Sequence, residues 1–282
     1  MAKTKDITKK SALLHRIFDK PNFRRTVEKE LYDMLIHKQS PHYATLLHHY
    51  PRLNWMNFKH VKLKELDFDL KAVTTEKGRE YQTPNGNSYP SVTTVLSEYN
   101  KKAIFEWRER VGAEEANRIA RSASNRGTKL HTVCEKYLLN EMTDLKLQTM
   151  MPDTKELFLS LKPHLDNHIG EVYSIEQALY STELRLAGRV DCIAQWDDEL
   201  AVIDFKSSTK PKLEENILNY FMQCTAYATM FEEVTSKPIN KLVIAIAVAD
   251  GTNQIFVREK TDHYMDSLYY YIGKYWKNRL TN

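Results

Sequence analysis

The stretch from Glu171 to Lys206 constrains the fold most, because it predicts three consecutive strands of one sheet. Its first two apolar runs are VYSIEQALYS and LAGRVDCIAQW, and a third, LAVIDFKSS, follows a short acidic turn at Asp197 and Asp198. Runs of this length that are rich in Val, Ile and Tyr are typical of strands. The sequence therefore predicts a β-sheet around which the rest of the chain is arranged.

Three carboxylates, Glu176, Asp191 and Asp204, lie in or at the ends of these predicted strands, and Lys206 follows the last of them. Residues i and i+2 of a strand point to the same face, so Asp204 and Lys206 project together. Asp191 is expected to close the preceding strand, where pairing across the turn can set it beside Asp204. Carboxylates with an ammonium group beside them predict a divalent-metal site that can attack a phosphodiester.

The D-x-K triplet alone is weak evidence, because it begins at four positions, Asp69, Asp144, Asp153 and Asp204. Only Asp204 ends an apolar strand that has a second carboxylate one strand earlier. A buried aspartate needs a compensating charge, so an ion-pair cluster without chemistry is the alternative on this pattern.

The composition predicts a soluble intracellular globular protein. Of 282 residues, 42% are apolar and 28% charged, and no apolar run approaches the roughly 18–20 residues of a membrane span. No signal-peptide core is visible. The cysteines, Cys134, Cys192 and Cys224, include no C-x-x-C pair, which favours buried reduced thiols over a zinc or iron–sulfur site.

The charge distribution divides the chain. Residues 1–75 carry 15 Lys and Arg against 8 Asp and Glu, whereas the remainder carries 26 against 29. We expect a basic, mainly helical N-terminal extension over 1–75 and a separate domain over 76–282. The extension is either an arm that contacts a polyanion or a solvated helical surface.

The segment after residue 77 predicts a hairpin and then a helix. Asn85-Gly86 indicates a type I′ turn between short strands around Tyr81 and Tyr89. Ser91 is expected to cap the following helix, and with Thr93 it forms either an anion site or an ordinary helix cap.

Three further predicted helices carry candidate residues. A charged helix is expected over 101–124, and a new helix after Gly127 places His131 beside a buried stripe, as a metal ligand or as a satisfied core residue. Gln223 and Tyr227 are four residues apart on a predicted helix over 214–233, so they share a face.

Five ordered elements resemble the RecB-type branch of the PD-(D/E)XK nuclease superfamily: Gly127-x-x-x-His131, Glu176, Gly188-Arg-Val-Asp191, Ile203-Asp204-Phe205-Lys206 and Gln223-x-x-x-Tyr227. The set is most similar to the mitochondrial genome-maintenance exonuclease family and its phage-encoded relatives. The resemblance covers about residues 78–280.

The resemblance implies an α/β fold, a restriction-endonuclease-like core with a central mixed β-sheet flanked by helices. It implies an exonuclease that uses Mg²⁺, with Mn²⁺ as a substitute, on the ends or flaps of single-stranded DNA in replication, repair or recombination. Relatives thread the strand under a helical arch, for which the helices between Ser91 and Ser124 are the candidates. The partners expected are single-stranded DNA or flaps and replication or recombination proteins, with no membrane.

Two other functions on the same fold stay open, an inactive DNA-end-binding or recombination subunit and a structure-specific endonuclease. The low glycine content and the many Lys, Asn and Tyr residues suit an AT-rich phage genome. The expected location is therefore the cytoplasm of a bacterial host rather than the mitochondrial matrix.

The resemblance also implies a role for each site residue. Asp191, Asp204 and the backbone carbonyl of Phe205 would bind one metal ion, and Glu176 and His131 would serve a second metal or the phosphate. Lys206 would orient the attacking water, and Gln223 and Tyr227 would brace this lysine. The candidate DNA contacts are Ser91, Thr93, Trp107, Arg108, Arg189, Ser207, Ser208, Lys210 and Lys212.

Overall fold

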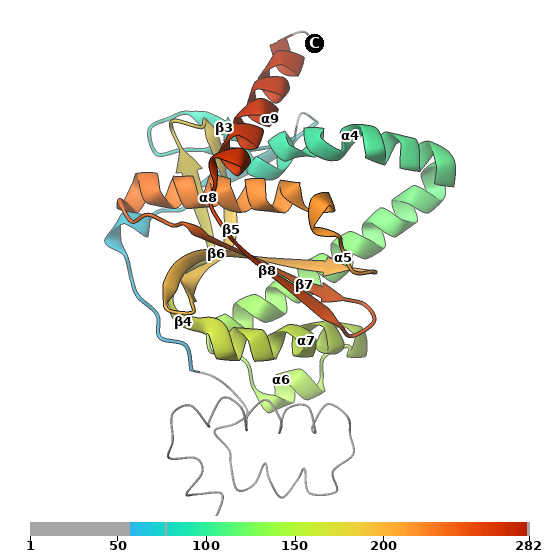
Figure 1. Ribbon diagram of the computed structural model, residues 1–282, viewed down its shortest axis with the longest axis vertical. Coiled ribbons are helices and arrows are strands. Elements are labelled where there is room, and N and C mark those ends of the chain that lie inside the picture. The colour runs from blue at the N-terminus through green and yellow to red at the C-terminus, as the bar shows by residue number, and fades with distance from the viewer. Residues whose placement is uncertain (1–56, 77, 281–282) are drawn as a thin grey trace, which may run out of the picture. The chain divides into compact units, whose positions relative to one another are not determined.

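The structure is a computed structural model that describes residues 57–76 and 78–280, so the part of the predicted helical extension over 1–56 lies outside the described residues. The chain alternates between strands and helices (Figure 1). The strands are β1 (Lys71–Thr75), β2 (Gly78–Gln82), β3 (Ser88–Pro90), β4 (Ile169–Ser181), β5 (Leu186–Trp196), β6 (Glu199–Ser208), β7 (Lys241–Val248) and β8 (Asn253–Glu259). The helices are α4 (Val92–Val111), α5 (Ala113–Leu138), α6 (Asp144–Gln148), α7 (Pro152–His168), α8 (Leu218–Thr235) and α9 (Asp262–Leu280).

The central sheet is mixed and has the strand order β4-β5-β6-β7-β8. The pairs β4–β5, β5–β6 and β7–β8 are antiparallel, and β6–β7 is parallel. The three strands predicted between Glu171 and Lys206 are confirmed as β4, β5 and β6. The predicted fold class, a mixed sheet flanked by helices, is confirmed as well.

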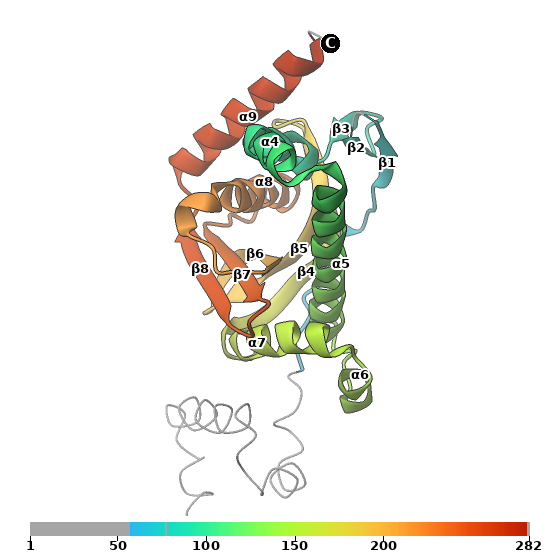
Figure 2. The same ribbon diagram turned by 90° about the vertical axis from the view of Figure 1, so that its right-hand side faces the viewer.

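Helices cover both faces of this sheet (Figure 2). Helices α5 and α7 pack on one face, whereas α8 packs on the other, and α4 and α9 pack against α8. β7 is buried along almost its whole length because it lies between these two layers. The three cysteines are buried free thiols, as expected. No helix in the described part of the chain has the length and apolar content needed to cross a membrane.

The predicted hairpin around Asn85 exists, but its turn type differs from the prediction. The loop runs from Thr83 to Asn87, and the Gly86 amide donates to the Thr83 carbonyl at 3.0 Å. Gly86 has φ +82°, whereas Asn85 is not among the described residues with positive φ. A type I′ turn centred on Asn85 and Gly86 needs positive φ at both residues, and Asn85 lacks it. The bond that forms instead closes a turn from Thr83 to Gly86, in which Pro84 takes the first central position that its negative φ suits.

The described part of the predicted helical extension, residues 57–75, is mostly extended and contains one 3₁₀-helix, Lys64–Leu66. The Val172 amide donates to the Lys59 carbonyl at 2.8 Å, and β1 pairs with β2 in a three-stranded sheet. Leu66, Phe68 and Leu70 recur every second residue, which is the period of extended chain rather than of a helix. The predicted boundary at residue 75 therefore falls between two paired strands.

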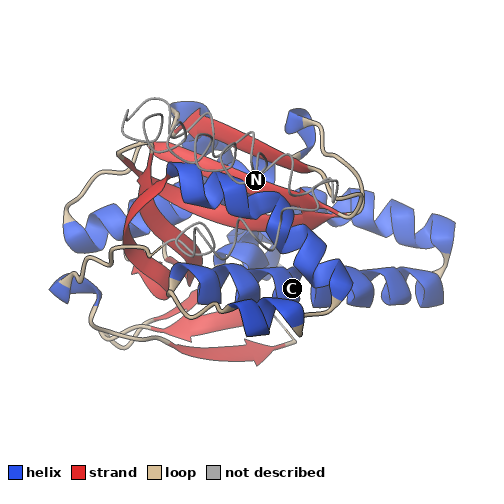
Figure 3. Ribbon diagram, turned by 90° about the horizontal axis from the view of Figure 1, so that it is seen from below, coloured by secondary structure: helices blue, strands red, loops and turns tan. Residues whose placement is uncertain are grey.

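Helices α4 and α5 diverge from a shared turn as a V, and the turn extends beyond the sheet (Figures 1 and 3). Ser91 caps α4, as predicted, because its hydroxyl accepts a hydrogen bond from the Thr94 amide at 3.0 Å. Gly112, with φ +86°, separates the two helices. The expected break near Gly127 is absent, because α5 is continuous through this residue. A helical glycine costs about 0.5–1 kcal/mol, which the packing of α5 on the sheet outweighs.

Candidate active site

The pairing of β5 with β6 brings the two aspartates together. Cys192 pairs with Ile203, so the next residues outward, Asp191 and Asp204, lie side by side, as predicted. Asp191 does not close its strand as expected, because β5 continues to Trp196. The strand continues because residues 192–196 all pair with β6 before the turn.

His131, Glu176 and Asp191 come from three different elements and form one cluster. Each offers a ligand atom, and these atoms all lie within 4.8 Å of one another. His131, on α5, places Nδ1 3.3 Å from Asp191 Oδ1. One nitrogen and two carboxylates at this separation could hold a divalent cation. The structure therefore brings together three of the four side chains that the sequence assigns to metal binding.

The backbone at Glu176 adopts an unusual conformation for a strand residue, with φ +49°. The Arg189 guanidinium donates to the Glu176 carbonyl and pairs with Asp69 Oδ1 at 3.1 Å. A left-handed non-glycine residue in a strand costs of order 1–3 kcal/mol and persists only when its surroundings hold it. Arg189, a predicted DNA contact, thus has a structural task that the sequence did not reveal, which is to hold the carbonyl of Glu176.

Asp204 is the fourth predicted ligand and lies next to the cluster. Its side chain is 2% exposed, and Lys206 Nζ contacts Asp204 Oδ2 at 2.5 Å. Asp204 Oδ1 is also buried and accepts no hydrogen bond from a described residue. A buried carboxylate oxygen without a donor fits a metal ion, which would satisfy it. The donor set therefore fits the implied cation.

The backbone of Phe205 is oriented as the predicted ligand set requires. Its amide donates to Asp191 Oδ2 at 2.8 Å, beyond the last β5–β6 pair at Cys192 and Ile203. The amide and carbonyl of one strand residue point to the same side, so the Phe205 carbonyl also faces Asp191. Its role as a metal ligand stays a prediction.

Burial and mutual charge set the protonation of the carboxylates. Burial, together with the negative charge of Asp191, raises the pKa of Glu176 to about 7. Burial also raises the pKa of Asp204 to about 6, although the Lys206 ammonium opposes this shift. Asp191 is buried too, but its hydrogen bond and ion pair with His131 outweigh burial and lower its pKa. These carboxylates cannot all be ionised easily until a cation joins them.

The two basic groups respond in the opposite sense. Burial alone would lower the pKa of His131, but the hydrogen bond and charge of Asp191 raise it. Burial would likewise lower the pKa of Lys206, but Asp204 and Asp191 raise it well above its usual value. Lys206 therefore keeps its positive charge beside the two aspartates.

Helix α8 packs on the face of the sheet opposite to α5 and contacts the site strands β5 and β6. Tyr227 is buried, and a Cβ atom placed on Gly188 would lie only 2.8 Å from its hydroxyl oxygen. Gly188 is therefore required because the tyrosine ring lies directly on the β5 backbone. Gln223 lies one turn earlier and is partly buried.

Tyr220 was missed by the sequence analysis. The Lys206 ammonium lies over its ring, 5.0 Å from the centroid, which is a cation–π contact. The signal available was periodicity, because Tyr220 precedes Tyr227 by seven residues on the same helical face.

The predicted DNA contacts divide into two groups. Ser207 and Ser208 end β6, the strand that carries Asp204 and Lys206, and Lys210 and Lys212 lie in the loop that follows it. The Ser208 hydroxyl is engaged with the Lys210 carbonyl at 2.6 Å, whereas Lys210 and Lys212 are exposed.

The second group lies on α4 and at its start. The Ser91 hydroxyl is 3% exposed and occupied by capping, whereas Thr93 is exposed. Trp107 and Arg108 are partly buried, and Arg108 donates to Asn117 at 2.7 Å. Their contacts to DNA stay predictions.

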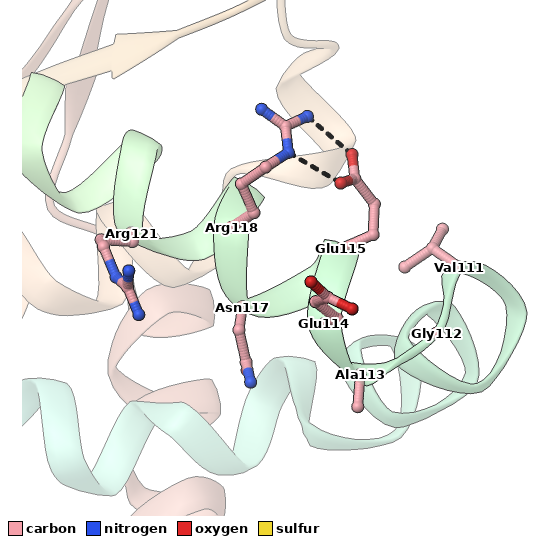
Figure 4. A pocket seen from close by; sticks show the side chains of 8 residues that line it. All are labelled: Val111, Gly112, Ala113, Glu114, Glu115, Asn117, Arg118 and Arg121. Carbon is pink, nitrogen blue, oxygen red and sulfur yellow. Dashed lines mark hydrogen bonds and ion pairs between the residues drawn. The ribbon is translucent and has the colours of Figure 1, made fainter.

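A pocket at the α4–α5 turn is separate from this site (Figure 4). Arg118 and Glu115 in its wall hydrogen-bond to each other twice, both at 2.7 Å. Arg118 precedes His131 by 13 residues of continuous helix, or about 20 Å along the axis. The pocket therefore takes no part in the carboxylate cluster.

Comparison with known proteins gives a consistent result. Residues 94–263, more than half of the chain, match the profile of the PD-(D/E)XK nuclease superfamily. The chain is 28% identical over 215 residues to mitochondrial genome maintenance exonuclease 1 of Xenopus tropicalis, covering 71% of this chain and 60% of that protein. It is 25% identical over 177 residues to the Homo sapiens protein of the same name, covering 59% and 51%. These matches confirm the resemblance predicted from the sequence.

Two features limit what these matches imply about the activity of this chain. The chain spans only about half to three fifths of the length of these relatives. A solved structure from Eubacterium rectale aligns with 55% of this chain and 66% of its own at a TM-score of 0.40 and 9% identity, too low to support a conclusion.

Proposed function

The chain belongs to the PD-(D/E)XK nuclease superfamily, and from this premise we propose that it is a Mg²⁺-dependent exonuclease that degrades single-stranded DNA from free ends or flaps. One observation carries the proposal. The buried Asp204 lies beside Asp191, contacts the Lys206 ammonium through Oδ2, and has an Oδ1 atom that meets no donor among the described residues. This arrangement combines carboxylate oxygens that could bind a metal ion with a cation that could face a phosphate.

The side chains would divide the chemistry as follows. Asp191, Asp204 and the Phe205 carbonyl would hold a divalent cation, with Glu176 and His131 beside it. When bound, such a cation lowers the pKa of water and neutralises charge that develops on the phosphate. The oxygen-rich set favours Mg²⁺, and the His131 nitrogen is compatible with Mn²⁺.

Lys206 would act on the phosphate and on the attacking water. Its ammonium is held between Asp204 and the ring of Tyr220, so it is already oriented before the substrate arrives. A preorganised charge stabilises the transition state without reorganisation during the reaction. Tyr227 and Gln223 would keep α8 seated on β5 and so preserve this geometry.

The choice of DNA ends as the substrate rests on the relatives, whose names describe exonucleases that maintain a mitochondrial genome. A role in replication, repair or recombination, together with partner proteins from those processes, is proposed on the same ground. A phage origin and a bacterial cytoplasmic location stay predictions from composition.

An inactive end-binding subunit is the second candidate function, and the site argues against it. Such a subunit is expected to have lost a carboxylate or the lysine, but Glu176, Asp191, Asp204 and Lys206 are all present. An endonuclease with the same site is the third candidate, which an experiment can separate.

The test is digestion of a linear single strand labelled at its 5′ or 3′ end, beside a circular single strand, with Mg²⁺ or with EDTA. We expect Mg²⁺-dependent loss of the linear strands while the circle stays intact. Cleavage of the circle would favour the endonuclease. Retained DNA binding without any cleavage would refute the proposal and favour the end-binding subunit.

A matched pair of variants assigns the activity to this site. Asp204→Asn with Lys206→Met removes both charges of the buried pair and should abolish digestion. Asp153→Asn with Lys155→Met changes the same D-x-K triplet at the start of α7 and should leave digestion intact. Equal activity in the two double variants would contradict the assignment.

A further inference from the structure

Arg126, on α5, is the one arginine in the described part of the chain that is not exposed and yet has no hydrogen-bond or ion-pair partner there. Its Nε atom is buried and meets no acceptor among described residues. Arg108 and Arg279, the other described arginines that are not exposed, bond to Asn117 and Glu80. A guanidinium cannot lose its charge, so Arg126 lacks an anion that its surroundings call for.

Arg126 adjoins the part of α5 that packs on β6. The next residue, Gly127, faces β6, because a Cβ atom placed there would lie 3.8 Å from Ser207 Oγ. One turn further on, His131 contacts Asp191. Arg126 precedes His131 by five residues, which is about 7.5 Å along the helix axis and about 140° around it. The Arg126 side chain therefore leaves α5 on a different side from His131 and lies outside the carboxylate cluster.

This arrangement is unfavourable for the free protein. A partly buried donor without an acceptor loses its hydration and gains no hydrogen bond in return. Arginine is also the residue best suited to phosphate oxygens, because its planar guanidinium donates two parallel hydrogen bonds. A residue that disfavours the free fold and suits a phosphate points to a ligand.

We propose that Arg126 binds a backbone phosphate of the DNA strand outside the cleavage site. This inference rests on the proposed function, because it takes DNA as the substrate. The phosphate supplies the acceptor that Nε lacks. Arg126 is thus a DNA-binding residue rather than a catalytic one, because it does not reach the reacting atoms.

The test measures the binding of a fluorescein-labelled single-stranded oligonucleotide by anisotropy at several salt concentrations, in EDTA so that no cleavage occurs. For single strands, the slope of log K against log salt changes by about 0.7 for each phosphate contact. We expect Arg126→Gln to reduce the slope by about this amount and to weaken binding about tenfold at low salt. Arg126→Lys should retain the slope.

Arg118→Gln is the matched control, because Arg118 lies on the same helix but is already paired with Glu115 (Figure 4). This control should leave the slope unchanged. Oligonucleotides with a single neutral methylphosphonate locate the contact. One neutral linkage should weaken binding by the wild-type chain and have no effect on Arg126→Gln.

Thermal unfolding without DNA separates binding from a structural role. A ligand-binding Arg126 predicts that Arg126→Gln melts at the same temperature as the wild type or higher, whereas a structural role predicts a lower melting temperature. Wild-type digestion and binding together with an unchanged slope in Arg126→Gln would overturn this inference and leave the proposed function standing. Absence of DNA binding and digestion by the wild type would overturn both.

Discussion

Gly188→Ala tests whether the contact between β5 and α8 shapes the site. The new Cβ atom would lie 2.8 Å from Tyr227 Oη, 2.9 Å from Cε1 and 3.3 Å from Cζ. The ring is 3% exposed, so it has no free space into which it can turn. Overpacking of this kind costs roughly 1–3 kcal/mol, and each kcal/mol lowers the melting temperature of a domain of this size by about 2–4 °C.

Calorimetry and urea titration measure this loss against a control in the same chain. Gly273 lies inside α9 with no atom within 4 Å of its Cβ position and no positive φ. Gly273→Ala should therefore stabilise the chain by about 0.5–1 kcal/mol, because alanine has less backbone entropy to lose. The same substitution should therefore lower the free energy of unfolding at Gly188 and raise it at Gly273.

A double variant shows whether the tyrosine causes the loss. In a Tyr227→Leu background the aromatic ring is absent, so Gly188→Ala should cost much less than in the wild type. A Gly188→Ala variant as stable as Gly273→Ala would refute the reasoning. An equal cost in both backgrounds would show that another neighbour is responsible.

Three further predictions concern charges at the site. Lys206→Met leaves the buried Asp204 carboxylate without its cation and should lower the free energy of unfolding, measured in urea, by about 3–5 kcal/mol. Adding Asp204→Asn to this variant should restore most of the lost stability. An equal loss in the single and double variants would contradict this prediction. The pKa of Glu176 is raised from 4.5 to about 7, and that of Asp204 from 3.8 to about 6. Between the usual and the raised values the folded chain therefore binds more protons than the unfolded chain. The stability that these two carboxyl groups contribute falls as the pH rises through this range. Mg²⁺ needs the ionised carboxylates, so the rise in melting temperature that it causes should be larger at pH 8 than at pH 5.5, and an equal rise would count against the metal site. Arg189→Met should weaken Mg²⁺ binding in calorimetry about 10–100-fold by releasing the Glu176 carbonyl, whereas Asp69→Asn, which breaks only the exposed ion pair, should not.

The sheet and the aspartate pair were accessible from the sequence because their signals are local. The β-branched runs predict β4, β5 and β6, and the short turn at Asp197 and Asp198 sets the register that pairs Cys192 with Ile203. That register alone brings Asp191 beside Asp204. The Ser91 cap is a local signal of the same kind, because its partner, the Thr94 amide, is three residues away.

Two errors arose where a weak local preference opposed packing. Gly127 predicts a helix boundary, yet α5 continues through it because the helix lies along β6. The scattered apolar and aromatic residues up to about Leu70 were interpreted as helical, although the alternation of Leu66, Phe68 and Leu70 indicates extended chain. Period was the better guide than composition in this segment.

His131 is a different case, because its partners are remote in the chain. Its helix and its buried stripe were predictable, but its contact with Asp191 joins residues 60 positions apart. The resemblance to known nucleases indicated His131 as a candidate ligand, and the structure shows that it lies in one cluster with Glu176 and Asp191.

The sequence by itself determined the strands, the helix cap and the adjacency of Asp191 and Asp204, because periodicity, capping and a short turn act over a few residues. The tertiary structure alone decided the left-handed Glu176 held by Arg189, the seat of Lys206 on Tyr220, the contact of Tyr227 with Gly188 and the unpaired Arg126. Each of these depends on burial or on a contact between distant segments. A shifted pKa, a strained backbone or an unpaired donor is set by the surroundings of a residue in the folded chain. These surroundings come from several segments, so the sequence of one segment does not reveal them.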